Sequence, residues 1–275
     1  IQHWLARIIV GLKHLKIFSF GPRPQDFLAC NAPVKPLYDL GLEVMENSEL
    51  DLYDLFCQAE GNPSLEAIVA DMIRELGPGQ DNALLNRLAR LELALTGFCE
   101  KNLGASRYAV FANKCWPSFE KYFGCTPCFV NSRLASRGMP VACEVDIYGA
   151  LSQYMATAAS LAPATLLDIN NSVPREMYEK AGEIVSGYSP DDLFMGFHCG
   201  NTPSSCLKDF SLKHQLIMHR LMEPGREPDI TRGTLEGTIR PGAVTIFRLQ
   251  GAAGCSLLAY AAQGEVLDIN PQSFG

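Results

Sequence analysis

Apolar and polar positions in the first 112 residues repeat with two different periods. Helical spacing is found at 1–14, 64–76 and 82–102, while short apolar runs typical of strands lie at 16–20, 41–45 and 107–112. Strands that alternate with helices of this length are typical of an α/β fold, because each crossover helix returns the chain to the same edge of the sheet. We therefore predict an open, mostly parallel sheet with flanking helices.

Local signals mark where several of these elements begin and end. Ser48 followed by Asp51 has the spacing of a capping box, so a helix is expected to start after Ser48. The Gly-Pro-Arg-Pro run at 21–24 interrupts the first strand. Gly104 is expected to end the long helix at 82–102, because glycine tolerates the positive φ of a helix C-terminus.

The pattern changes near residue 160. Beyond it the chain has few long helical patterns and many short β-like runs separated by Gly and Pro, at 165–169, 192–198, 235–239, 243–249, 256–262 and 265–269. Such punctuation suits a small barrel or sandwich. The sequence predicts a Rossmann-like α/β domain at 1–160 and a β-rich, barrel-like domain at 161–275.

Composition narrows the possible partners. The 275 residues are 47% hydrophobic and 19% charged, which is an ordinary globular balance. A net charge of −7 argues against nucleic acid, because binding phosphates requires a basic surface. The sequence has no apolar run of about 18 residues, so no membrane span is expected.

Ten cysteines are scattered through the chain, most of them within apolar runs. We interpret them as reduced thiols of a cytoplasmic protein. Cys125 and Cys128 have the spacing of a redox or zinc motif, but no second pair lies at a suitable distance. A structural role is therefore preferred for them, with a redox role left open.

The two ends of the chain carry no terminal signal. Ile1 is not a methionine, and the sequence stops abruptly at Gly275. The expectation is that the chain is part of a longer protein.

Three side chains capable of binding a metal follow short apolar runs. Glu144 ends one run ahead of a helical segment, Asp168 lies in a second, and His198 lies in a third, before a Gly-Asn turn. Asp168 follows Glu144 by 24 residues, which is about one helix plus a return strand. Neighbouring parallel strands could therefore bring the two carboxylates together at the sheet edge where open α/β folds bind ligands.

Two carboxylates and one imidazole suit Mn²⁺ or Mg²⁺ better than an ion that prefers thiolates. Such an ion can polarise the carbonyl of an open-chain sugar, so that a carboxylate can move a proton between adjacent carbons. That chemistry is aldose–ketose isomerisation through an enediol. The alternative is that Glu144 and Asp168 are helix caps or salt-bridge partners, and that His198 is a core histidine.

Three further residues are candidates for sugar binding. Lys114 and Trp116 follow the strand at 107–112, so they are expected on the same rim as Glu144. Lys114 could hold a hydroxyl or an anionic group, and Trp116 could pack on a sugar face, although a tryptophan there is also typical of a core. Asn201 could bind a hydroxyl or form a turn.

Two stretches resemble the L-fucose isomerase / L-arabinose isomerase superfamily. Ala142-Cys-Glu-Val-Asp-Ile-Tyr-Gly-Ala-Leu151 is similar to its metal-site segment, with Leu166-Leu-Asp-Ile-Asn170 at the matching distance. Glu236-Gly-Thr-Ile-Arg-Pro-Gly-Ala-Val-Thr-Ile-Phe-Arg248 is similar to its C-terminal β-domain, and Gly196-Phe-His198 to the position of a histidine ligand in the arabinose isomerase branch. The similarity corresponds to the middle and C-terminal domains of the family.

The resemblance implies a Mn²⁺-dependent aldose–ketose isomerase in which Glu144 and Asp168 bind the metal and act as acid and base. It also implies a homo-oligomer, a hexamer for the intact protein. The family has a further histidine ligand near its C-terminus and an N-terminal domain, neither of which has a match here. His214 and His219 lie too early for that ligand and are interpreted as a surface or helix pair. The chain by itself is expected to hold an incomplete site.

Two other classes of function stay open at this point. A non-catalytic sugar-binding module could use the same open sheet, and a metal-dependent sugar lyase or hydrolase could use the same ligands. The sequence does not identify the sugar, since contacts worth one or two kcal/mol, roughly, are enough to change a stereochemical preference.

Overall fold

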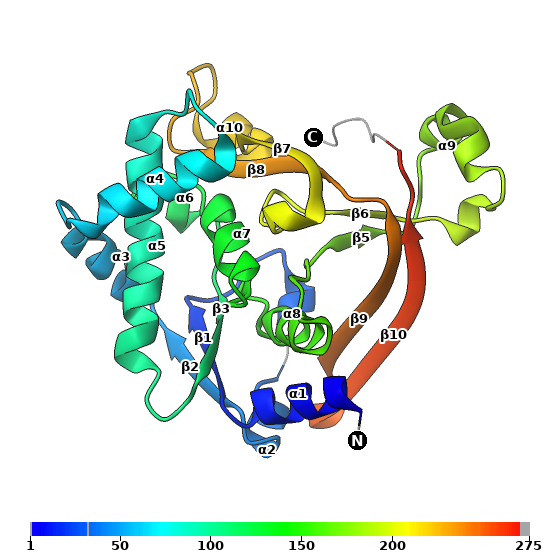
Figure 1. Ribbon diagram of the computed structural model, residues 1–275, viewed down its shortest axis with the longest axis horizontal. Helices are drawn as coiled ribbons and strands as arrows, with labels where there is room; N and C mark the ends of the chain where they lie inside the picture. Colours follow the sequence, from blue (N-terminus) through cyan, green and yellow to red (C-terminus); the bar gives the residue numbers. More distant parts are fainter. Residues whose placement is uncertain (1, 32, 270–275) are drawn as a thin grey trace.

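A parallel four-stranded sheet forms the centre of the molecule, with helices on both faces (Figure 1). The computed structural model describes residues 2–31 and 33–269. The strand order is β2-β1-β3-β4, with bounds Glu43–Asn47, Leu15–Phe20, Tyr108–Ala112 and Val141–Ala142. All three pairings are parallel, which confirms the predicted open parallel sheet.

Alternation along β1 divides the core into two halves. All six residues of β1 are buried, as expected of a central strand covered on both faces. Phe18 and Phe20 point to one face and join the larger core, whereas Leu15 and Ile17 point to the other. The period of two residues in an extended strand is the physical cause of this division.

Helices α3 (Glu49–Gln58), α4 (Ser64–Leu76), α5 (Asn82–Asn102), α6 (Ser118–Phe123) and α7 (Cys128–Ser136) contribute to the larger core. On the opposite face lie α1 (His3–Leu12), α2 (Lys35–Asp39) and α8 (Ile147–Ser160). The capping box at Ser48 and Asp51 is present at the start of α3. Gly104 has a φ of +63° just after α5, as predicted.

A buried ion network ties α4, α5 and α7 together. The Arg133 side chain is only 2% exposed and binds Glu92 at 2.7 Å, with Glu75 and Asp71 completing its contacts. Buried charges are tolerated only when they are paired in this way. The network helps to fix α7, which packs against β4, the strand that leads to Glu144.

The C-terminal half is made of antiparallel pairs. They are β5 (Asp168–Asn170) with β6 (Met195–Phe197), β7 (Leu207–His214) with β8 (Arg232–Ile239), and β9 (Gly242–Ala252) with β10 (Ser256–Val266). The short helices α9 (Arg175–Ala181) and α10 (Leu216–Met222) lie between them. The described residues of this half thus form three two-stranded sheets and no closed barrel, so the barrel-like part of the prediction is not confirmed.

These pairs pack on the helices of the first half. Leu207 of β7 and Leu235 of β8 join the larger core beside α7, while Leu249 of β9 and Leu257 of β10 pack into the smaller core beside α8. In Figure 1 the long β9–β10 hairpin curves along one side of the molecule. The predicted boundary falls where α8 ends, at Ser160. Residues 270–275 of the predicted second domain lie outside the described residues.

None of the helices within 2–31 and 33–269 combines the length and the apolar character needed to cross a membrane.

Candidate active site

Glu144 lies in a tight turn at the C-terminal edge of the parallel sheet. The turn connects β4 to α8, and both Glu144 and Val145 have a φ of +55°. This region is costly for a residue with a Cβ, by roughly 1–3 kcal/mol each, and such strain gathers at functional sites. Backbone hydrogen bonds hold it, from Val145 N to Asn113 O at 2.7 Å and from Asp146 N to Cys143 O at 3.0 Å.

Asp146 secures the end of this turn. Its Oδ1 accepts a hydrogen bond from Gly149 N at 2.8 Å, which caps α8. The Arg248 guanidinium of β9 binds the same carboxylate in bidentate fashion, with Nη1–Oδ2 at 2.6 Å and Nη2–Oδ1 at 2.9 Å. A Cβ at position 149 would lie 2.4 Å from Asp146 Oδ2, so glycine is required there. The C-terminal hairpin therefore helps to hold the turn that carries Glu144.

His198 is the residue that contacts Glu144. It follows β6, its side chain is 2% exposed, and its Nε2 lies 3.6 Å from Glu144 Oε2. Burial opposes the charged imidazole, but Cys199 and Glu144 outweigh burial and raise the pKa of His198 well above its usual value. Its Nδ1 is buried and has no hydrogen-bond partner among the described residues.

Asp168 lies beside His198 across an antiparallel pair. In the register of β5 and β6 its Cα partner is Phe197, the residue before His198. The expectation that Asp168 and Glu144 end neighbouring parallel strands is wrong, because β5 belongs to a separate sheet. Although its side chain reaches solvent, burial and the charge of Glu144 raise the pKa of Asp168, and His198 opposes this rise. The charge of Glu144 therefore acts on Asp168, although the two residues do not end neighbouring strands of one sheet.

The carboxylates of the site act electrostatically on the Cys30 thiol. This thiol lies in a short 3-10 helix at Leu28–Cys30, far from the other site residues in sequence. Burial, followed by the charges of Asp146 and Glu144, raises its pKa to about 12, while Arg248 lowers it. A site where carboxylates outweigh cations favours a bound cation.

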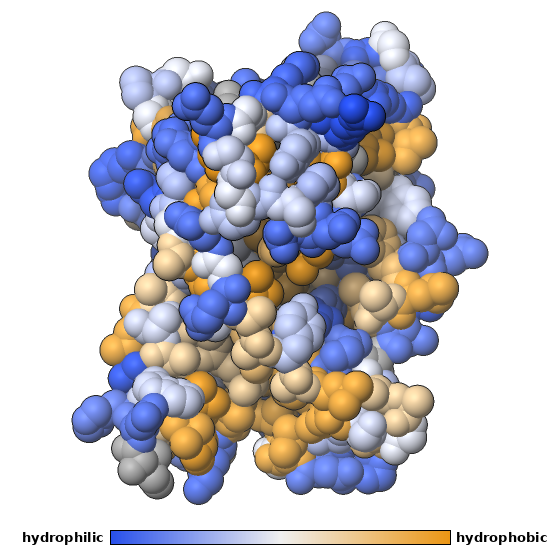
Figure 2. Space-filling view, turned by 90° about the vertical axis from the view of Figure 1, so that its right-hand side faces the viewer, coloured by the Kyte–Doolittle hydropathy of each residue, from blue (hydrophilic) through white to orange (hydrophobic). Residues whose placement is uncertain are grey.

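A large hollow of approximately 3480 Å³ lies in front of these residues. Its walls include Glu144, Asp168, His198 and Trp116. Figure 2 shows apolar side chains gathered over the adjacent face of the molecule, among more polar ones. Since small-molecule pockets are typically about 300–1,000 Å³, a sugar would occupy only part of this hollow.

The other predicted sugar ligands are placed differently. Lys114 Nζ binds Glu49 at 2.6 Å and the carbonyl of Pro22 at 2.9 Å, so these contacts would have to break before it could hold a sugar. Trp116 is half-buried at the wall of the hollow. Asn201 is 5% exposed, and its Oδ1 has no partner in the described structure.

The donor types fit a hard divalent ion, but their spacing is only partly that of a metal site. Glu144 and His198 are close, and Asp168 faces the same hollow. Within the described residues, however, no three His, Cys, Asp or Glu side chains are near enough together to hold an ion. The carboxylates of Glu144 and Asp168 are the groups that favour a cation here, whereas the imidazole would have to lose its proton before it could bind one.

Of the remaining candidates, Cys128 touches this arrangement, because it hydrogen-bonds to Cys199, the residue after His198. Cys125 and Cys128 are buried free thiols, and burial raises the pKa of Cys125 to about 12. The rings of His214 and His219 are in contact, with centroids 5.1 Å apart. Both findings agree with the structural interpretation of these residues.

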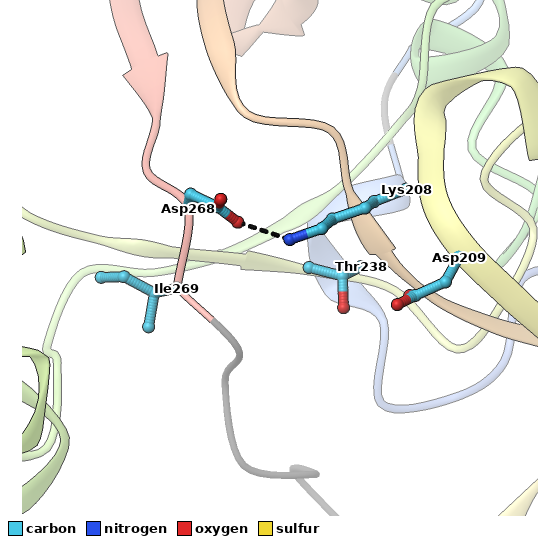
Figure 3. A pocket seen from close by; sticks show the side chains of 5 residues that line it. All are labelled: Lys208, Asp209, Thr238, Asp268 and Ile269. Carbon is cyan, nitrogen blue, oxygen red and sulfur yellow. Dashed lines mark hydrogen bonds and ion pairs between the residues drawn. The ribbon is translucent and has the colours of Figure 1, made fainter.

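A smaller hollow of about 280 Å³ lies near the end of the described chain. Its wall consists of Lys208, Asp209, Thr238, Asp268 and Ile269. Lys208 Nζ and Asp268 Oδ1 form an ion pair at 2.8 Å across it, as Figure 3 shows. These two charges are committed to each other, and the pair ties the segment after β10 to β7.

Two residues of the site were not predicted from sequence. Asp146 stands where a helix N-cap is expected, and this signal could have identified it. Arg248 ends the motif at 236–248, but nothing in the sequence indicates that it pairs with a carboxylate 102 residues earlier.

Comparison with known proteins supports the resemblance seen in the motifs. Residues 196–275 match the family model described as L-fucose isomerase, C-terminal domain. The sulfoquinovose isomerase of Alkalicoccus urumqiensis is 28% identical over 270 residues, which cover 96% of this chain and 53% of that relative. The chain thus spans about half the length of this curated relative.

Two other relatives match shorter stretches. The sulfoquinovose isomerase of Priestia megaterium is 26% identical over 155 residues, covering 55% of this chain and 33% of that protein. The one from Clostridium sp. strain MSTE9 is 28% identical over 172 residues, covering 62% of this chain and 33% of that protein. Together with the domain match, these relatives confirm the resemblance to the L-fucose isomerase superfamily.

Proposed function

We propose that this chain, a relative of the L-fucose isomerase superfamily, carries the reaction centre of an aldose–ketose isomerase. The observation that carries the proposal is the contact between Glu144 and His198, at 3.6 Å, on the wall of a hollow that Asp168 also lines. The resemblance gives the same three positions a chemical role. The proposal concerns the protein to which this chain belongs, since the chain spans about half the length of the Alkalicoccus urumqiensis relative.

The reaction moves one proton between adjacent carbons of an open-chain sugar. Glu144 and Asp168 are the groups that would take the proton from the carbon next to the carbonyl and return it to the carbonyl carbon, by way of an enediol. Glu144 is rigidly placed, because Asp146 and Arg248 hold its turn. The Trp116 ring at the wall would cover one face of the sugar and exclude water.

Mn²⁺ or Mg²⁺ is the proposed cofactor, held by Glu144, Asp168 and His198. When bound, a hard divalent ion would polarise the sugar carbonyl and acidify the adjacent C–H. The carboxylate charges that act on Cys30 support this choice over an anionic ligand at the same position. Binding would require the imidazole to give up its proton, so affinity for the ion should fall at acid pH.

Sulfoquinovose is the first sugar to test, because the relatives are sulfoquinovose isomerases. Their names extend to this chain only as a proposal. Neutral aldoses such as fucose and arabinose belong in the same panel, since the domain match is to L-fucose isomerase.

The decisive variant is Glu144→Gln, which keeps the size of the side chain and removes its charge. We expect loss of isomerase turnover with the fold intact, because both metal binding and proton transfer lose a carboxylate. Glu227→Gln is the matched control, as Glu227 is an exposed carboxylate elsewhere on the surface. Turnover is followed by chromatography of aldose and ketose with added Mn²⁺.

Mn²⁺ titration calorimetry gives a readout that does not depend on the choice of sugar. Binding should weaken in Glu144→Gln and stay unchanged in Glu227→Gln. Full isomerase activity in Glu144→Gln would refute the proposal. Sugar binding that is unaffected by EDTA, with no turnover of any sugar, would favour a non-catalytic binding module instead.

A further inference from the structure

Two thiols lie in contact directly behind the turn that carries Glu144. Cys143 Sγ is 3.8 Å from Cys115 Sγ, and both residues are buried. Cys115 follows β3 and Cys143 follows β4. The two strands are hydrogen-bonded neighbours, with Ala112 and Ala142 as Cα partners.

The geometry is close to that of a disulfide. A disulfide requires the sulfurs to be about 2.05 Å apart, so the two atoms need to approach by less than 2 Å, roughly. Neighbouring strand ends already hold the two backbones side by side, which removes most of the entropic cost of bringing them together. Two further thiols adjoin the pair, because Cys199 hydrogen-bonds to both Cys115 and Cys128.

The pair borders the hollow, with exposed fractions of 7% for Cys115 and 1% for Cys143. Cys115, Cys143 and Cys199 all contribute to its wall, whereas Cys125 and Cys128 do not. The thiols that border the hollow are therefore not those with the redox-motif spacing, and the spacing of 28 residues between Cys115 and Cys143 gave no sequence signal.

We propose that Cys115 and Cys143 form a site of reversible oxidation by peroxides. In the first step one sulfur attacks a peroxide oxygen, the O–O bond breaks, and a sulfenic acid and one water (or alcohol) form. In the second step the other sulfur displaces the sulfenic oxygen as water and the S–S bond forms. The two thiols lose two hydrogens and two electrons in total, and the peroxide takes up both.

The consequence for the site follows from chain connectivity. Cys143 immediately precedes Glu144, and the turn is held at a φ of +55°. Movement of the Cys143 sulfur toward Cys115 would shift the Cys143 backbone, and this shift would change the direction of the neighbouring Glu144 side chain. Oxidation would therefore reduce turnover, an effect that rests on the proposed isomerase function, whereas the formation of the disulfide does not.

Peptide mapping by mass spectrometry tests the site directly. The protein is incubated with hydrogen peroxide, its remaining thiols are alkylated, and the digest is searched for linked peptides. Hydrogen bonding to Cys143 and Cys199, together with burial, raises the pKa of Cys115, so the incubation uses excess peroxide and long times. We expect a Cys115–Cys143 link, a loss of two hydrogens from the intact mass, and reversal by dithiothreitol.

Variants separate this site from general thiol oxidation. Cys115→Ser should abolish the link, and Cys143→Ser gives an independent check if the first variant folds poorly. Cys57→Ser is the control, because Cys57 is exposed and lies in α3. A native, peroxide-treated protein in which Cys115 and Cys143 remain alkylatable while Cys57 is oxidised would overturn the proposal, and so would a link between Cys125 and Cys128 alone.

Activity is the second, separate readout. In protein that shows isomerase turnover, loss of turnover on oxidation and recovery with dithiothreitol would support the effect on Glu144. A fully active, fully linked protein would overturn that effect. If no sugar is turned over, the proposed function fails, and the mapping result still decides whether the oxidation site exists.

Discussion

Glu120 offers a sharp test of the buried electrostatics near the site. This residue of α6 is completely buried, and within the described structure neither carboxylate oxygen has a hydrogen-bond partner. Burial, with a smaller contribution from Cys199, raises the pKa of Glu120 from 4.5 to about 8. The side chain is therefore a neutral acid in the folded protein at neutral pH and an ionised one in the unfolded chain.

The magnitude follows from proton linkage. Below pH 4.5 the folded and the unfolded protein both keep the Glu120 proton, so the ionisation of Glu120 costs no stability there. As the pH rises toward 8, unfolding releases one proton, so the free energy of unfolding falls by about 1.4 kcal/mol per pH unit. Over the whole interval this loss reaches roughly 5 kcal/mol, which is a large fraction of the stability of an ordinary domain.

The perturbation is Glu120→Gln, which keeps the shape and cannot ionise. Urea unfolding of the parent and the variant is measured between about pH 5 and pH 8. The variant's free energy of unfolding, relative to the parent's, should rise by about 1.4 kcal/mol for each pH unit. Glu227→Gln, an exposed carboxylate, should run parallel to the parent throughout.

Parallel curves for Glu120→Gln and the parent would refute the reasoning. They would mean that Glu120 ionises at its ordinary pH in the folded protein, and hence that water or an unseen cation reaches it. No knowledge of the substrate is needed, so this test is independent of the proposed function.

Two further predictions concern the residues that hold the site. Arg248→Lys should lower isomerase turnover by roughly 10- to 100-fold with a smaller change in KM. The reason is that one ammonium cannot replace the bidentate contact to Asp146, so the turn that carries Glu144 shifts. Unchanged kcat in steady-state assays would contradict this. Arg133→Met should lower the free energy of unfolding by about 3 kcal/mol in urea titrations, because the buried Glu92 keeps only its contact with Arg137 among these ion pairs, while Asp71 and Glu75 also lose an ion pair; a loss within experimental error would show that the network contributes little.

Local sequence patterns predicted most of the first half of the fold. The capping box at Ser48, the helix end at Gly104 and the parallel strands required only residues near one another in the chain. Short elements were missed, among them α7 and β7. A strand such as 207–214, in which only Leu207 is buried, has too few apolar positions to be recognised from sequence. The runs at 256–262 and 265–269 were predicted as two elements, but β10 is continuous through Val266.

Some features of the candidate site were likewise predicted from sequence, and others were not. The position of Glu144 at a strand end followed from sequence, His198 was predicted within a short strand and lies just after β6, and the motif resemblance gave both a chemical role. The parallel neighbour expected for Asp168 was wrong, because the pairing of β5 with β6 depends on which strand edge is free once the chain has folded.

What the sequence determined by itself is the set of elements governed by local periodicity and capping, together with the chemical types gathered in the motifs. Tertiary structure alone decided that Arg248 binds Asp146, that the charges of Asp146 and Glu144 act on Cys30, and that Cys115 contacts Cys143. These contacts join residues many positions apart, and their energies depend on burial and on distances of a few ångströms. Burial and interatomic distance cannot be derived from the order of the residues alone, because both arise only when the sheet, its helices and the C-terminal hairpins pack together.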